Sequence, residues 1–114
     1  MMPGTYLGLC RQRAGLTIEA VARATVSSPV DVDAAIEALT NAEADREQLG
    51  DADIARLARV VSLVPTVYFG LVDGKVAHGI CRNCGCTWTD ACSGGCAWVD
   101  RDKTLCSTCA VTTA

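Results

Sequence analysis

The chain has 114 residues, which fits one ordinary domain or a small domain with an appended module. Its net charge of -3 and its pI near 4.9 argue against a surface built mainly to neutralise phosphates. No apolar run approaches the ~20 residues of a membrane span, and the first residues lack the basic-then-apolar order of a secretory signal. We therefore expect a soluble, cytoplasmic protein without a membrane partner.

The first part of the chain shows the periodicity of amphipathic helices. Apolar residues recur there at intervals of three and four. The sets, in chain order, are Leu7, Cys10 and Ala14; Ile18, Val21 and Ala22; Val32, Ala35, Ile36 and Leu39; and Ile54, Leu57, Val61 and Val64. The pattern predicts four helices, and residues 64–72 predict a short fifth helix or an extended segment.

Capping and turn residues divide these segments. Gly15 predicts the end of the first helix, because glycine readily adopts the left-handed conformation that follows a last helical turn. Thr17 predicts the N-cap of the second helix, and Ser28 with Pro29 predicts the start of the third. The V-D-G sequence at 72–74 predicts the turn that leads into a cysteine-rich segment.

Seven of the eight cysteines and the only histidine lie in the last third of the chain. The C-x2-C pattern occurs there twice, as Cys81 with Cys84 and as Cys106 with Cys109. Two such pairs are typical of tetrahedral zinc sites, and in a reducing cytosol clustered cysteines more often bind metal than form disulfides. Gly85, directly after the first pair, lets backbone amides point at sulfur. We therefore predict one zinc ion held by these four cysteines.

Four further potential ligands lie in the same segment, namely His78, Cys86, Cys92 and Cys96. With the paired cysteines they make eight, the number that two tetrahedral ions require, so a second zinc ion is one interpretation. Other interpretations stay open: His78 as a solvated loop residue, Cys92 with Cys96 as a small disulfide, or an iron–sulfur cluster. Zinc is the metal we favour. Because the ligands are almost all sulfur and no nucleophile and base pair can be picked out, we expect a structural metal and no enzyme.

Two stretches of the helical part carry a family resemblance. Residues 9–24, LCRQRAGLTIEAVARA, and residues 51–69, DADIARLARVVSLVPTVYF, resemble helices of the lambda-repressor/Cro-like helix-turn-helix family, with Ala22 at the small position where a partner helix crosses. The motifs CGCT, ACSGGCAWV and LCSTC resemble cysteine-rich modules of bacteriophage and prophage proteins. The resemblance implies a mainly α fold in a bacterial host: a helix-turn-helix-like bundle over 1–73 and a zinc-knuckle or ribbon-like module over 74–114.

The third predicted helix departs from that family. A DNA-reading helix should present Arg, Lys, Asn, Gln or Ser to bases and phosphates. Here Asp31, Asp33 and Glu37 would face the phosphates with negative charge. From Asp31 to Asp53, eight acidic residues stand against the single Arg46. Repulsion of this kind opposes the electrostatic attraction that supplies most non-specific DNA affinity.

Two functions follow as hypotheses. In the first, a small non-enzymatic zinc-binding regulator or adaptor of phage or prophage type contacts a protein partner through its acidic third helix. In the second, a sequence-specific transcriptional regulator of the lambda-repressor/Cro-like class contacts DNA through Arg11, Arg13 and Arg23. We favour the first because of the acidic helix. The family resemblance also implies that a homodimer is compatible with either function.

Overall fold

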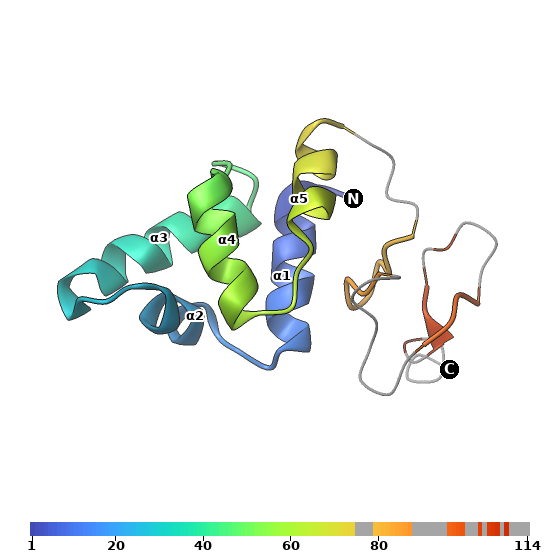
Figure 1. Cartoon of the computed structure of the whole chain (residues 1–114), viewed down its shortest axis with the longest axis horizontal. Helices are drawn as coiled ribbons and strands as arrows, with labels where there is room; N and C mark the ends of the chain where they lie inside the picture. The colour runs from blue at the N-terminus through green and yellow to red at the C-terminus, as the bar shows by residue number, and fades with distance from the viewer. Residues whose placement is uncertain (75–78, 88–95, 100–102, 104, 108, 110–114) are drawn as a thin grey trace.

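The computed structural model describes residues 1–74, 79–87, 96–99, 103, 105–107 and 109. Five α-helices occupy the first part of the chain: α1 Pro3–Arg13, α2 Ile18–Thr25, α3 Val32–Glu43, α4 Asp51–Val60 and α5 Pro65–Val72. The predicted mainly α fold is confirmed, and the segment expected to be helical or extended forms α5. The described part of the cysteine-rich segment lies beside α1 and α5, opposite α2 and α3 (Figure 1). No described helix is long and apolar enough to cross a membrane.

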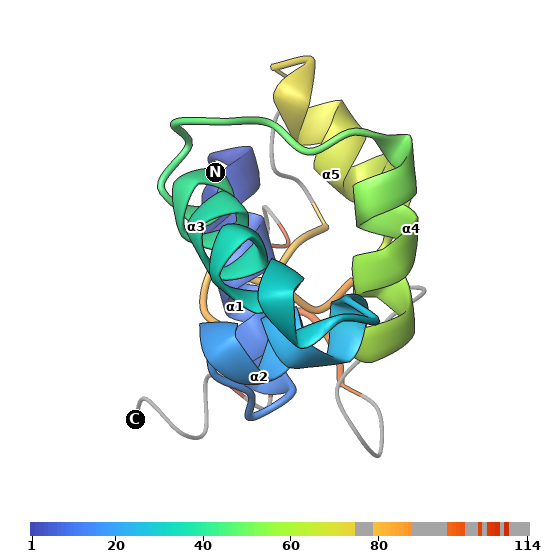
Figure 2. The same ribbon diagram turned by 90° about the vertical axis from the view of Figure 1, so that its left-hand side faces the viewer.

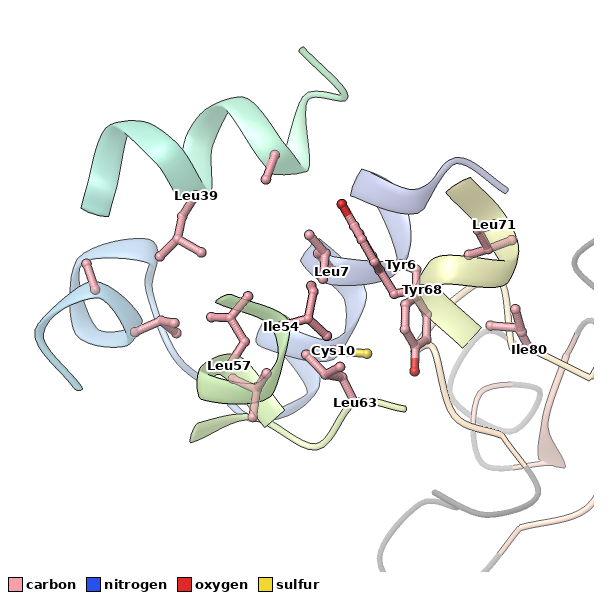
Figure 3. Packing of buried hydrophobic residues seen from close by; sticks show 14 of the residues in the cluster. Tyr6, Leu7, Cys10, Leu39, Ile54, Leu57, Leu63, Tyr68, Leu71 and Ile80 are labelled. Carbon is pink, nitrogen blue, oxygen red and sulfur yellow. The ribbon is translucent and has the colours of Figure 1, made fainter. Parts of the chain in front are cut away.

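The helices bury one apolar core. α1 packs against α3 and α5, whereas α2 packs against α3 and α4. Figure 2 shows α1 and α3 on one side of the bundle, α4 and α5 on the other, and α2 across one end. The least exposed core side chains include Tyr6, Cys10, Val21, Ala22, Ala42, Ile54 and Tyr68. Figure 3 shows Ile54 and Leu57 of α4 pointing into this core beside Leu7 of α1.

Two buried tyrosines accept hydrogen bonds from the backbone of connecting segments. The Tyr6 hydroxyl of α1 accepts a hydrogen bond from the Val64 amide at 2.9 Å. The Tyr68 hydroxyl of α5 accepts one from the Leu49 amide at 3.1 Å. Both side chains are at most 1% exposed, so their hydroxyl groups need partners within the protein. The first bond holds the start of α5 against α1, and the second holds the loop before α4 against α5.

α1 approaches the C-terminal end of α3 closely at Gly4. A Cβ atom at Gly4 would overlap the backbone carbonyl groups of Ala42 and Glu43. The Gly4 amide also donates a hydrogen bond to Asp45 Oδ1 at 2.8 Å. Asp45 therefore satisfies an N-terminal amide of α1, and its negative charge suits the positive end of that helix. The missing side chain at Gly4 sets how closely the two helices meet.

Three predicted boundaries are confirmed. Gly15 follows α1 with a φ of 73°, and its amide donates to the Gln12 carbonyl at 2.9 Å, as expected for a glycine that ends a helix. Thr17 is the N-cap of α2, and its hydroxyl accepts a hydrogen bond from the Ala20 amide at 3.1 Å. Gly74 has a φ of 81° in the turn predicted after α5.

The predicted end of the fourth helix is wrong. α4 ends at Val60 and does not reach Val64. Val64 is extended, with φ of -107° and ψ of 110°, because Pro65 sterically disfavours the α conformation in the residue before it. Val61 and Leu63 are still buried, so apolar residues of the connection continue the core beyond the helix.

Two other expectations differ at helix ends. Ala14, expected on the buried face of α1, is exposed because it is the C-cap residue of that helix. Ser28 makes no side-chain cap hydrogen bond, and α3 begins only at Val32, after the 3-10 turn Pro29–Asp31. In this turn the backbone bond from Asp31 to the Ser28 carbonyl, 3.0 Å long, takes the place of a side-chain cap.

Gly4→Ala is expected to lower the free energy of unfolding by about 1–3 kcal/mol, because the new methyl group must displace backbone atoms of α3. Chemical denaturation followed by circular dichroism measures this change. Thr5→Ala, at an exposed position of the same helix, is the matched control and should stay within about 0.5 kcal/mol of wild type. Equal stability of the two variants would contradict the close approach of α1 to α3.

Candidate metal centre

A tight turn surrounds the first cysteine pair. The Gly85 amide donates to the Cys81 carbonyl at 2.8 Å, and the Cys81 amide donates to the Cys86 carbonyl at 3.0 Å. Gly85 has a φ of 79°, a conformation that glycine adopts without steric cost. The turn therefore depends on glycine at the position directly after Cys84.

Backbone amides point at sulfur atoms in both cysteine pairs, which the sequence predicted for the first pair through Gly85. The amides of Asn83 and Cys84 form hydrogen bonds to the Cys81 sulfur. The Cys109 amide does the same for the Cys106 sulfur. Such hydrogen bonds stabilise a thiolate, which is the form of cysteine that binds metal.

A short antiparallel ladder positions the second pair. Trp98 pairs with Cys106 in an isolated β-bridge, and the partly buried Trp98 packs against the cysteine cluster. The Val99 amide extends the ladder by donating to the Leu105 carbonyl at 3.1 Å. Cys96, which closely precedes the ladder in the chain, is thereby brought near Cys106.

The four paired cysteines converge as predicted. The sulfur atoms of Cys81, Cys84, Cys106 and Cys109 all lie within 4.8 Å of one another. The Cys84 and Cys106 sulfurs are 3.8 Å apart. A tetrahedral zinc ion with Zn–S distances of about 2.3 Å holds its ligands roughly 3.8 Å from one another. The cluster is therefore of the right size and composition for one metal ion.

The thiols of the cluster differ in pKa. Burial raises the pKa of the Cys106 thiol, but hydrogen bonds from the Cys109 amide and from neighbouring thiols together lower it to about 6. Burial raises the pKa of the Cys84 and Cys86 thiols well above the usual value. Cys106 is therefore mainly a thiolate at neutral pH, whereas Cys84 and Cys86 must release protons when a metal binds.

A second group of sulfur atoms adjoins the first. The Cys86 and Cys96 sulfurs are 3.6 Å apart. Both lie within 4.8 Å of the Cys106 sulfur. The sequence had grouped Cys86 and Cys96 with His78 and Cys92, which lie outside the described residues. The structure thus brings together two of the four residues assigned to a second ion and adds Cys106 to them.

The cysteine cluster packs on the helical part. A Cβ atom at Gly85 would lie 3.2 Å from Leu9 Cβ and 3.5 Å from Cys10 Sγ, both in α1. Ile80, directly before the first cysteine pair, is 6% exposed and belongs to the helical core, where it lies beside Leu71 (Figure 3). The sequence did not predict these contacts, because they join residues that are far apart in the chain and no local pattern indicates them.

Two of the arginines proposed for DNA contact are engaged within the helical part. Arg11 forms a bidentate ion pair with Glu43, with Nε–Oε2 and Nη2–Oε1 distances of 2.7 and 3.0 Å. The exposed fractions of these two side chains are only 18% and 16%, so the pair is structural and joins α1 to α3. Arg13 donates to the Ser62 carbonyl at 2.9 Å.

The third such arginine and the acids of α3 lie at the surface. Arg23 pairs with Glu19 at 2.8 Å, and both side chains are more than half exposed. Asp31, Asp33 and Glu37 are exposed, and none of them forms an ion pair within the described part of the chain. The acidic surface expected on the third helix is therefore accessible.

Comparisons with known proteins assign this chain to no family. No protein-family model, curated protein or solved structure matches the chain. The geometry of the cysteine cluster and the charges of the helical surface are therefore the features that bear on function.

Cys84→Ser should lower the zinc content of anaerobically purified protein, because it removes one of four thiolate ligands. The chain after Gly79 should then exchange its amide hydrogens faster, and it should lose more protection than the helical part, which keeps its own apolar core. Cys10→Ala removes a buried thiol outside the cluster and should retain the metal, so it serves as the control. Elemental analysis that finds no zinc or iron in the wild-type protein would contradict the metal site.

Proposed function

We propose that this chain is a small, non-enzymatic zinc-binding regulator or adaptor that acts by contacting a protein through its acidic third helix. The convergence of four cysteine sulfurs within 4.8 Å carries the metal part of the proposal. Four thiolates complete a tetrahedral coordination sphere, which is typical of a structural zinc site. The metal would then stabilise the fold and would not perform chemistry.

The size of the cluster favours a single ion over an iron–sulfur cluster. In an iron–sulfur cluster, cysteines bound to different irons are separated by sulfide, so those sulfurs lie farther apart than ligands of one ion. Sulfurs that all lie within 4.8 Å fit around one ion. Zinc suits this set because it binds thiolates tetrahedrally and needs no redox partner.

The cysteine-rich segment has a physical need for the metal. Apart from the helical residues Ser107 and Cys109, its described residues form turns and one isolated bridge. So little backbone pairing stabilises a segment poorly, whereas metal binding contributes directly to the free energy of folding. Regulation by loss of the metal would therefore act on this segment first.

The start of α3 supplies a surface suited to a protein partner. Asp31, Asp33 and Glu37 are exposed there, and Val30 beside them has 84% of its surface exposed. An exposed apolar side chain next to charged groups can be buried by a basic, partly apolar partner surface. In contrast, the same acids would repel a phosphate backbone.

Charge reversal tests this surface. Asp33→Lys combined with Glu37→Lys should leave the protein folded and lower its stability by about 1 kcal/mol at most, because both positions are exposed and only Asp33 lies in the first turn of α3. The same double variant should no longer retain the protein partner that immobilised wild-type protein captures from host cytosol, as identified by mass spectrometry. Glu47→Lys combined with Asp73→Lys makes the same change in net charge at exposed positions outside α3 and should keep the partner. Unchanged capture by the first variant would refute the role of the acidic surface.

DNA regulation by a lambda-repressor/Cro-like protein is the second candidate. Its support is the order of short helices together with the exposed Arg23, whose side chain is 62% exposed. On the adaptor proposal, wild-type protein should show no salt-sensitive retention on random duplex DNA at low ionic strength, where phosphate contacts are strongest. Electrophoretic mobility shift over a salt series measures this. Tight, salt-dependent binding to one operator sequence would instead establish the second candidate.

A further inference from the structure

The Cys106 sulfur lies in both sulfur groups of the C-terminal segment. It is within 4.8 Å of the Cys81, Cys84 and Cys109 sulfurs, and within the same distance of the Cys86 and Cys96 sulfurs. The two groups share no other member. A thiolate sulfur has enough lone pairs to bind two metal ions at once, so this position is that of a bridging ligand.

We propose that the protein holds two zinc ions joined by the Cys106 thiolate. The first ion takes Cys81, Cys84, Cys106 and Cys109, and the second takes Cys86, Cys96 and Cys106. This inference rests on the proposed metal site and extends it to a binuclear centre. Three of the four tetrahedral positions of the second ion are supplied by described residues.

The local backbone brings the ligands of both ions together. One turn supplies Cys81 and Cys84 to the first ion and Cys86 to the second, and a 3.0 Å backbone bond from Cys81 to Cys86 closes that turn. The ladder around Cys106 brings Cys96, a ligand of the second ion, next to the shared Cys106, because Cys96 closely precedes the ladder in the chain. A 3.6 Å separation between the Cys86 and Cys96 sulfurs is within the range for two ligands of one tetrahedral zinc ion.

Charge balance permits the second ion. One Zn²⁺ with four thiolates carries a net charge of about -2. Adding a second Zn²⁺ together with the two thiolates of Cys86 and Cys96 adds no net charge. The Cys86 and Cys106 side chains are each 1% exposed, and burying an uncompensated charge is costly. A shared thiolate therefore lets six cysteines bind two ions without burying further charge.

Native mass spectrometry of the full, anaerobically prepared chain should find two zinc ions. Cys96→Ser should weaken binding of the second ion by about 100-fold or more and leave the first unchanged, since ligand loss exceeds the effect of losing a supporting residue. Cys106→Ser should weaken the binding of both ions, as measured by competition with a chelator. Cys10→Ala, outside both groups, should keep both ions. A mass 2 Da lower without zinc at the second site would reveal a disulfide, of Cys96 with Cys86 or with Cys92, and would overturn the proposal.

Cobalt(II) tests the bridge itself. Two high-spin cobalt ions that share a thiolate couple antiferromagnetically, so the electron paramagnetic resonance signal should rise with the first equivalent and fall with the second. Signals that simply add would refute the bridge. One bound ion that depends on Cys84 but not on Cys96 would overturn the binuclear centre and leave the proposed function intact. No bound ion at all would overturn both the binuclear centre and the zinc site of the proposed function.

Discussion

Mutual repulsion between clustered thiolates is the constraint on which the C-terminal segment depends. Sulfurs within 4.8 Å of one another cannot all ionise unless a cation lies among them. Burial adds to the cost of ionisation, and it raises the pKa of the Cys84 and Cys86 thiols. Against the effect of burial, hydrogen bonds from the Cys109 amide and from neighbouring thiols lower the pKa of Cys106 to about 6. A metal ion removes the conflict by compensating every thiolate at once. Without a metal, the turns and the short ladder of this segment depend on a few backbone hydrogen bonds and on packing at Gly85 and Ile80.

The helical part in turn depends on close contacts made by small residues. Gly4 lets α1 meet the end of α3, and Gly85 lets the first cysteine turn lie against Leu9 and Cys10 of the same helix. α1 therefore contacts both the helical core and the proposed metal centre. Ile80 adds to this link from the other side, because it is buried among helical residues and directly precedes Cys81. Folding of the bundle and metal binding are expected to stabilise each other for this reason.

Periodicity and local chemistry predicted the helices and the convergence of the four paired cysteines well. Gly15 and Thr17 act through neighbouring backbone groups, so their roles could be inferred from sequence alone. The end of α4 was missed because apolar periodicity continues past it, although Pro65 was a local signal against a helix at the residue before it. The ion pair of Arg11 with Glu43, 32 residues apart, leaves no local trace. The place of Cys106 in both sulfur groups was missed for a different reason, because counting ligands assigns each cysteine to a single group.

The structure also shows which acids of the helical part are free to bind a partner. Glu43 is neutralised by Arg11, Asp53 pairs with Arg56, and Asp45 binds the Gly4 amide, so these acids serve the fold. Asp31 and Asp33 lie at the start of α3, where the positive end of the helix favours negative charge. A stabilising role could therefore account for both without any partner. Glu37 lies one turn further along, beyond the reach of that effect, and is exposed. Its charge has no explanation in the helical fold, which makes Glu37 the acid that most directly supports a binding surface.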